Sequence, residues 1–387
     1  MDYGKPSESG EADSLLEILR QSFNFPKSSC EQYVEIVGLD NLRQIRLGGE
    51  TVAGLAILPM GQWFGGQCVP MAGIAAVAVA PHHRGAGVAL ELLRGALAEL
   101  QERGFPLSVL YPATLQLYRR AGYEAAGSRY LWGIPTRSIQ LNDRHLPARR
   151  LSPMDYGILR AVGDQRARGT NGNLDRSEVL WKRLDWAVTE AVHTYVFGSE
   201  GRPEGYVVFT QVKREQGYDI RIRDLAALTP AAGRRIWTFL ADHSSLVQEV
   251  VWPGPAVEPL LWFIREPKHR LIQPELWLLR LVHVAKALEL RGYPEDAVAE
   301  LHLEIRDDVL AENSGRYVLS VANGRAEVTR GGRGDLRLDV RLLAPLYTGL
   351  LTVSQLRSIG SVDSTADALA AASRLFTGTE PWMPDAF

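Results

Sequence analysis

The stretch Val77-Ala78-Val79-Ala80-Pro81-His82-His83-Arg84-Gly85-Ala86-Gly87-Val88-Ala89 runs from an apolar strand through a turn into a helix. Pro81 ends the strand, and Gly85 and Gly87 bring main-chain N–H groups into the turn with no side chain to cover them. The helix predicted over 88–103 adds its unpaired N-terminal N–H groups and the positive end of its dipole. An anion such as a pyrophosphate fits this arrangement.

The spacing of the glycines excludes two common phosphate-binding motifs. A dinucleotide fold has G-x-G-x-x-G with an acid about 20 residues on, and a P-loop has four residues between its glycines and then Lys and Ser or Thr. This chain instead has Arg84-x-x-Gly87-x-Ala89 behind Val77-x-Val79-x-Pro81, which resembles the acetyl-CoA motif of the GCN5-related N-acetyltransferase (GNAT) superfamily. A strand-to-helix turn without a ligand is the alternative, but the order of strand, turn and helix favours a ligand site.

Composition indicates a soluble enzyme of several domains. A chain of 387 residues has room for two or three domains. The 43 Lys and Arg residues nearly balance the 45 Asp and Glu residues, so we expect no nucleic acid partner. Cys30 and Cys68 are the only cysteines and have no metal-ligand spacing, so we expect neither a disulfide nor a metal. Residues 1–12 have no hydrophobic signal core and no apolar run could span a membrane, so we expect no membrane partner and a cytoplasmic location.

The segments around the motif follow the GNAT order of strands and helices. Before it, helices are predicted over 14–23 and 30–37, and strands over 41–47 and 51–59 form a hairpin at Gly48-Gly49-Glu50. After it come a strand over 107–111, a helix over 115–120 closed by Gly122, and a further strand from Tyr123.

The middle of the chain repeats this unit at a spacing of about 150 residues. The hairpin around Gly205 repeats the one that leads to Gly54, and the strand 225–230 repeats the one that ends at Pro81. An internal duplication explains both, although shared strand chemistry also produces weak similarity at long periods.

The anion site of the repeat is predicted to be lost. When Pro230 is aligned with Pro81, the positions of Arg84, Gly87 and Val88 are taken by Gly233, Ile236 and Trp237. Bulky side chains then stand where phosphate oxygens need main-chain contact, so we expect the second unit to bind no CoA and to serve in packing.

From about residue 281 the pattern indicates a third, α+β domain. A helix over 282–290 precedes alternating strands such as 301–305, and a hairpin turns at Ala322-Asn323-Gly324. A helix over 364–376 leads to the tail Pro381-Trp382-Met383-Pro384-Asp385-Ala386-Phe387. Chain ends often fray, but this apolar tail with two prolines is predicted to pack as a plug.

Taken over its whole length, the chain resembles the Eis-type acetyltransferases. The most specific marks are the segment 77–90, the stretch Leu117-Tyr118-Arg119-Arg120-Ala121-Gly122-Tyr123, the segment Ile222-Arg223-Asp224-Leu225, and the Pro381-Trp382 tail that ends in Phe. The resemblance implies an α/β (α+β) chain with tandem GNAT folds. It places a catalytic GNAT domain at 1–138, a degenerate GNAT-like domain at 139–280 and a domain like sterol carrier protein 2 (SCP2) at 281–387.

The resemblance also implies where acetyl-CoA binds. The main chain of Val77, Ala78 and Val79 is expected to contact the pantetheine arm. The pyrophosphate is expected in the loop that follows, and two residues after the next strand are expected to touch the cofactor; these cofactor positions are Arg84, Gly85, Ala86, Gly87, Val88, Ala89, Leu90, Ala113 and Thr114.

Two catalytic roles follow from the same resemblance. Acyl transfer to an amine needs a base for the ammonium proton and an acid for the departing thiolate. Tyr118 matches the general acid, and a phenol with a pKa of about 10 is a suitable donor to a thiolate; without the motif it would be an ordinary half-buried aromatic residue. The C-terminal carboxylate of Phe387 matches the general base, for which burial must raise its ordinary pKa.

The acceptor amine is less defined. Relatives that acetylate aminoglycosides have acidic residues in the acceptor pocket, whereas this chain has Ala386 beside Phe387, Asp385 one step back and Asn24 in the first loop. Polyamine-like molecules such as aminoglycosides, or lysine side chains, are therefore the expected acceptors, with Asp385 as an anionic partner. The resemblance also implies a homohexamer.

Three further features of the sequence have interpretations of their own. The SCP2-like domain allows the protein to be a lipid-binding or scaffold protein with a vestigial acetyltransferase site, although the intact loop and terminal Phe387 argue against this. His82 and His83 are expected to be solvated or near phosphates and to hold no metal, because no third ligand is spaced to join them. Cys68 is interpreted as a packing residue.

Overall fold

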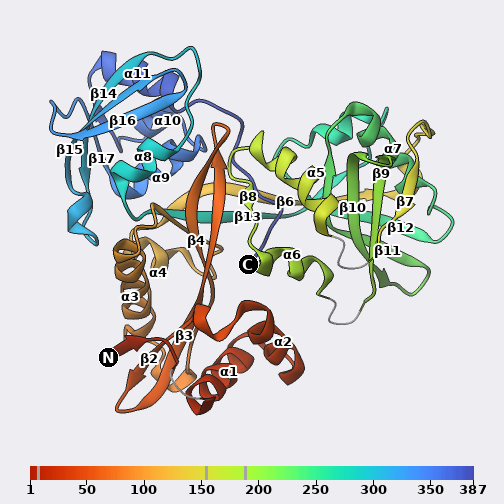
Figure 1. Ribbon diagram of the computed structural model, residues 1–387, viewed down its shortest axis with the longest axis horizontal. Coiled ribbons are helices and arrows are strands. Elements are labelled where there is room, and N and C mark those ends of the chain that lie inside the picture. Colours follow the sequence, from red (N-terminus) through yellow and green to blue (C-terminus); the bar gives the residue numbers. More distant parts are fainter. Residues whose placement is uncertain (7–8, 153–155, 187–189) are drawn as a thin grey trace.

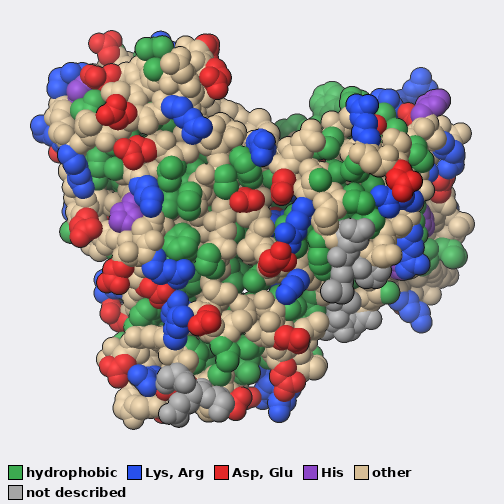
Figure 2. Space-filling view, viewed as in Figure 1, with side chains coloured by type: hydrophobic (Ala, Val, Ile, Leu, Met, Phe, Trp, Pro, Cys, Tyr) green, Lys and Arg blue, Asp and Glu red, His purple; other side chains and the backbone are tan. Residues whose placement is uncertain are grey.

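The computed structural model describes residues 1–6, 9–152, 156–186 and 190–387. Figure 1 shows three parts that meet around the C-terminus: an N-terminal α/β part, a central α/β part and a smaller C-terminal part. Basic and acidic side chains alternate over the face seen in Figure 2, with no large area of one sign.

The first unit is a sheet with helices on its faces. Strands β1 to β4 are antiparallel neighbours, whereas β4 and β5 pair in parallel across the crossover helix α3. Leu93 and Leu97 of α3 are fully buried, and burial of each stabilises the fold by about 1.5–3 kcal/mol. The elements are β1 (Asp2–Gly4), α1 (Ser9–Phe23), α2 (Lys27–Val37), β2 (Leu42–Leu47), β3 (Glu50–Phe64), β4 (Gln67–Val79), α3 (Val88–Glu102), β5 (Leu107–Leu110), α4 (Leu115–Arg120) and β6 (Glu124–Pro135).

The second unit has the same order of strands and helices, which confirms the predicted duplication. Strands β9, β10 and β11 are antiparallel, and β11 pairs in parallel with β12 across helix α7. Its elements are β7 (Ala148–Arg150), α5 (Tyr156–Arg168), β8 (Leu174–Asp175), α6 (Glu178–Asp185), β9 (Val192–Ser199), β10 (Arg202–Lys213), β11 (Tyr218–Ala227), α7 (Pro230–Ala241), β12 (Val247–Gly254) and β13 (Arg270–Leu281).

The residue-by-residue alignment of the two units is wrong beyond Pro230. Helix α7 begins at Pro230, and the Thr229 hydroxyl caps it by accepting from the N–H of Ala232 at 3.1 Å. Ile236 and Trp237 therefore lie inside the helix, each 1% exposed, and not in a turn. Only two residues separate β11 from α7, compared with eight between β4 and α3. The second unit lacks the glycine loop altogether.

Strand exchange joins the two units into one sheet. Strand β13 inserts between β5 and β6, with Leu278 opposite Leu110, and β6 pairs on its other side with β12. In the described part of the chain this sheet has 13 strands. The predicted boundaries at 138 and 280 stay predictions, and β13 shows that the second range supplies a strand to the first sheet.

The C-terminal part is a five-stranded sheet covered by helices, with strand order β16-β15-β14-β17-β18. The predicted hairpin turn is present, since Asn323 and Gly324 both have positive φ, +52° and +70°. The elements are α8 (Val284–Leu290), β14 (Ala299–Arg306), β15 (Gly315–Ala322), β16 (Arg325–Arg330), β17 (Leu336–Asp339), α9 (Val340–Thr348), α10 (Val353–Ser358), β18 (Asp363–Ser364) and α11 (Ala366–Leu375).

The tail after α11 is packed, as predicted, at the point where the three parts meet (Figure 1). The N–H of Trp382 donates to the carbonyl of Asn171 at 3.1 Å, and the N–H of Ser128 donates to the carbonyl of Pro381 at 3.1 Å. Met383 is fully buried. Of the helices described, none combines the length and the hydrophobicity needed to span a bilayer.

Candidate active site

The first part of the site is a fork between β4 and β5. Their parallel pairing extends from Met71 and Leu107 to Gly73 and Val109, after which β4 continues to Val79. The described residues provide no ladder partner on this side for 74–79. A bulge at Ala76, which has φ +52°, bends this free edge. The unpaired main-chain N–H and C=O groups along this edge can hydrogen-bond to the amides of a pantetheine arm. This is the role expected for Val77, Ala78 and Val79.

The second part is the loop between β4 and α3. Gly85 and Gly87 have φ of +82° and +83°, and a Cβ on either would meet nothing within 4 Å. The N–H groups of residues 85–89 have no hydrogen-bond acceptor within the described part of the chain. The loop lines a cavity of about 220 Å³. Five free donors at a helix N-terminus fit the pyrophosphate of acetyl-CoA.

The remaining predicted cofactor residues differ in their positions. Arg84, Val88, Ala89 and Leu90 line the loop cavity, and the Arg84 guanidinium is held by the carbonyl of Val79 at 3.2 Å. Ala86 is exposed at the tip of the loop, and Ala113 and Thr114 are exposed at the start of α4 and are not part of this cavity wall.

Three arginines that are not among the predicted cofactor residues lie beside the loop. Arg120 of α4 lines the loop cavity and an adjoining one of about 640 Å³, which Arg119 and Arg341 also line. Arg119 pairs with Glu124 at 2.8 Å and Arg341 with Asp308 at 2.7 Å. Arg341 comes from the C-terminal part, so spacing in the sequence could not place it here.

Tyr118 is buried in a hydrophobic cluster that also contains Ile74 of β4 and Leu110 of β5. Its side chain is 4% exposed, packs edge-on against Tyr123 at 6.2 Å, and its hydroxyl makes no hydrogen bond to any described residue. Burial raises the pKa of Tyr118 to about 12. The phenol therefore keeps its proton at neutral pH and has a free hydroxyl.

Phe387 lies at the branch point of the fork. A Cβ on Gly73, the last residue of β4 that pairs with β5, would lie 2.7 Å from Cε2 of Phe387. The Tyr111 ring meets the Phe387 ring edge-on at 6.1 Å, and the Tyr111 hydroxyl donates to the carbonyl of Asp385 at 2.8 Å. Phe387 also lines a cavity of about 160 Å³ with Ala75 and Ala76 of β4.

The structure does not place Asp385 in this cavity. Asp385 accepts from Arg176 Nε at 2.8 Å, its side chain is 8% exposed, and it lines a different cavity. Asn24 has φ +53° and is exposed in the loop after α1. The expected anionic partner for a polycationic acceptor is thus engaged elsewhere.

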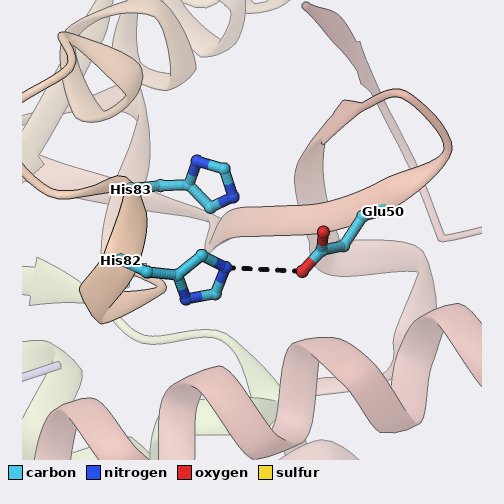
Figure 3. Close-up of side chains that lie close together, drawn as sticks. All are labelled: Glu50, His82 and His83. Carbon is cyan, nitrogen blue, oxygen red and sulfur yellow. Dashed lines mark ion pairs between the residues drawn. The ribbon is translucent and has the colours of Figure 1, made fainter.

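Glu50 joins the two histidines of the loop, which the sequence spacing did not reveal. The ligand atoms of Glu50, His82 and His83 lie within 4.8 Å of one another, and His82 Nε2 is 3.5 Å from Glu50 Oε1 (Figure 3). The side chains of His82 and Glu50 are 64% and 63% exposed. The reason for expecting no metal, the lack of a third ligand, therefore does not hold, although exposed groups of this kind are common without an ion.

The interior of the C-terminal part is filled by its own side chains. Leu303, Tyr317 and Tyr347 are buried to 1% exposure or less in one continuous core. A cavity of about 820 Å³ lies at its surface, and charged residues such as Glu304, Arg316 and Arg337 are part of its lining. This arrangement gives no support to the lipid-binding alternative.

Comparisons with known proteins agree with this architecture. Residues 5–126 and 172–281 each match an acetyltransferase (GNAT) domain, and residues 284–384 match a sterol carrier protein domain. A solved GCN5-related N-acetyltransferase from Anabaena variabilis is 44% identical over the full length of both chains, with a TM-score of 0.98.

Curated relatives point the same way. An uncharacterized N-acetyltransferase of Streptomyces griseus is 31% identical over 84% of this chain and 83% of its own length. The N-acetyltransferase Eis of Mycobacterium tuberculosis is 29% identical over 89% of this chain and 80% of its own length. The chain therefore belongs to the Eis-like N-acetyltransferases of the GNAT superfamily, a membership that implies acetyl-CoA as the acyl donor.

Proposed function

We propose that the protein transfers the acetyl group of acetyl-CoA directly to a small amine, with Tyr118 as general acid and the C-terminal carboxylate of Phe387 as general base. The observation that carries the proposal is the contact of Phe387 with Gly73. This contact brings the last residue of the sequence to the point where the free edge of β4 begins and where a cavity opens beside it.

The proposed reaction needs one group of the protein to accept a proton and another to donate one. The carboxylate of Phe387 takes a proton from the ammonium group, directly or through a water molecule, and the free amine attacks the thioester carbonyl. The C–N bond forms, the C–S bond breaks, and the hydroxyl of Tyr118 donates its proton to the departing sulfur. The acetylated nitrogen then loses its second proton, a proton from solvent restores the hydroxyl of Tyr118, and the proton on the Phe387 carboxyl returns to solvent. The net products are an acetamide, CoA and one proton.

The raised pKa of Tyr118 bears on its proposed role. A phenol with a pKa of about 12 is a weak donor to a thiolate in water, where a thiol has a pKa of about 8.5. Within a buried site the charged thiolate is also desolvated, which raises the thiol pKa and brings the two groups closer. Tyr118 would then release its proton only as negative charge develops on sulfur.

A small amine is favoured over a lysine side chain as acceptor. Phe387 and Ala76 line a half-open cavity of about 160 Å³, which a free small molecule can enter whole. The aminoglycoside expectation depended on Asp385, and the ion pair of Asp385 with Arg176 removes that support.

The base assignment is tested by extending the chain. An intact-mass measurement of the natural protein first establishes that Phe387 is its last residue. Adding two residues after Phe387 should abolish CoA release with amine acceptors, whereas the same two residues added before Met1 should not. Release of CoA at the unextended rate from the C-terminally extended protein would refute the base assignment.

The homohexamer and the cytoplasmic location are proposals from the same family resemblance. Exposed apolar side chains support an oligomer, since Trp262 is 83% exposed and Leu271 and Leu276 of β13 are 44% and 43% exposed. Light scattering coupled to gel filtration would measure the assembly mass, and cell fractionation would test the location.

A further inference from the structure

The cavity beside Phe387 has an aromatic lining. Phe23, Phe25, Tyr33 and Trp186 surround it, and Phe23 and Phe25 stack at 5.7 Å. Its volume is about 160 Å³; an engineered apolar cavity of about 150 Å³ is known to hold benzene. The space therefore matches one aromatic ring and its substituents.

The charge of this cavity does not suit a polycation. No acidic side chain lines it in the described part of the chain, and the carboxylate of Phe387 is committed to the amine proton in the proposed function. Arg183 is its basic residue. The Tyr33 hydroxyl and Arg183 Nη1 are both buried and have no hydrogen-bond partner among the described residues, so two donors of the lining residues are unused.

Arg183 is a cation without an ion pair. Its guanidinium lies 5.8 Å from the Trp186 ring and forms no salt bridge with any described carboxylate. The nearby Asp385 is held by Arg176 at 2.8 Å. A partly buried guanidinium without an ion pair is costly, and an anionic group on a ligand would relieve that cost.

An adjoining cavity adds further basic side chains to this region. It measures about 340 Å³ and shares Arg183 with the first. Arg221 and Arg223 line it as well, and Arg223 donates to the carbonyl oxygens of Trp186 and Arg183 at 2.7 and 3.1 Å. The carboxylate that lines this second cavity, Asp385, is the one bound to Arg176.

We propose that the acceptor is an aromatic monoamine that also carries a carboxylate, with its ring among Phe23, Tyr33 and Trp186, its amine toward Phe387 and its carboxylate on Arg183. The assignment rests on the proposed function, because it names the substrate class of the same site. The guanidinium of Arg183 supplies the donors to the carboxylate, and charge-assisted hydrogen bonds of this kind are among the strongest available.

The test compares matched amines with and without the carboxylate. Purified full-length protein with acetyl-CoA is given L-phenylalanine or phenethylamine, 4-(aminomethyl)benzoate or benzylamine, and spermidine or kanamycin, and CoA release is followed with a thiol reagent. In at least one aromatic pair the carboxylate-bearing member should have a kcat/KM at least about tenfold higher than its partner and than either polycation.

Variants of Arg183 separate recognition from folding. Arg183→Gln should reduce the kcat/KM ratio of the preferred pair about tenfold or more, and Arg183→Lys should restore part of it. Arg202→Gln, at an exposed position in the β9–β10 hairpin, should leave the ratio as in the parent protein. Thermal unfolding of each variant shows that the comparison is made on folded protein.

Different failures point to different errors. Equal rates within both pairs, preference for spermidine or kanamycin, or an equal loss on both members of a pair in Arg183→Gln would overturn the acceptor class while leaving acetyl transfer in place. Absence of CoA release with every amine would instead contradict the proposed function itself.

Discussion

The ring of Phe387 rests on the bare Cα of Gly73, where an added Cβ would come within 2.7 Å of the ring atom Cε2. Gly73 is also the last residue of β4 paired with β5. A glycine fits here because Phe387 occupies the space that a side chain at this position would fill. Gly73 therefore affects both the position of the proposed base and the fork between β4 and β5 in which the cofactor is expected to bind.

Gly73→Ala should displace the chain end with limited loss of stability. The atoms that the new Cβ meets belong to the rings or ends of Phe387 and Met60 side chains, which can move, and overpacking of this kind costs about 1–3 kcal/mol. We expect kcat to fall at least about tenfold if Phe387 supplies the base. Gly4→Ala in β1, where a Cβ meets nothing within 4 Å, is the control. An unchanged kcat in Gly73→Ala would argue against a role for Phe387 at this position.

The glycine loop offers a comparison matched in backbone conformation. Gly85 and Gly201 both have φ +82° and open space around the missing Cβ, but Gly201 lies in the β9–β10 hairpin. Alanine at either site therefore carries the same left-handed strain of about 1–2 kcal/mol. Only Gly85→Ala should weaken acetyl-CoA binding, by about tenfold in Kd measured by calorimetry. Equal Kd values for the two variants would place the pyrophosphate elsewhere.

Tyr118→Phe should lower kcat by about a hundredfold with little change in thermal stability. The hydroxyl has no hydrogen-bond partner among the described residues, so its removal leaves no polar group unsatisfied. Tyr123→Phe is the contrasting variant, because it removes a hydroxyl that lies 2.7 Å from Ser108 Oγ. It should reduce the free energy of unfolding by about 1 kcal/mol and retain kcat. An unchanged kcat in Tyr118→Phe together with a lowered kcat in Tyr123→Phe would assign the acid role to another group.

The pH dependence of turnover follows from the pKa of Tyr118. Burial raises that pKa to about 12, so the protonated form that the proposed acid requires persists from neutral pH to about pH 11. The rate should therefore show no alkaline decline from loss of the Tyr118 proton below about pH 11, as measured over the range in which the protein stays folded. A fall in kcat with a midpoint near 10 that disappears in Tyr118→Phe would show that the phenol titrates at its ordinary pKa.

The sequence predicts the local units of this fold and site well. The glycine loop, helix 115–120 and the Asn323-Gly324 turn each depend on residues next to one another, so their chemistry can be read directly. Strand exchange through β13 could not be predicted, because pairing of Leu278 with Leu110 joins residues far apart in the chain.

The errors in the predicted site have the same origin. Alignment on Pro230 assumed a loop that is absent, since proline begins a helix as readily as it ends a strand. Arg341, Arg183 and Glu50 reach the site only through tertiary packing. Asp385 is next to Ala386 in sequence, yet its ion pair with Arg176 turns it away from the Phe387 cavity.

A buried ionic network that holds the tail should make stability depend on acid. Asp224 is fully buried and binds Arg176 at 2.5 Å, Arg166 at 2.9 Å and the Tyr206 hydroxyl at 2.6 Å, and Arg176 also binds Asp385. Burial alone would raise the pKa of Asp224, but the guanidinium groups of Arg176 and Arg166 hold it well below its usual range.

Because this pKa is depressed in the folded state, the stabilisation is fully present above the unfolded value of about 3.9 and is lost as pH falls below it. Asp224→Asn should reduce the free energy of unfolding at pH 7 by about 3–5 kcal/mol, since two buried guanidinium groups lose their shared counterion. Its stability should also fall less steeply than that of the parent protein between about pH 4 and pH 2. Asp40→Asn, which removes an exposed pair with Lys5, is the control and should leave the free energy of unfolding nearly unchanged. Parallel stability curves for the parent protein and Asp224→Asn in acid would show that the network does not hold this carboxylate ionised.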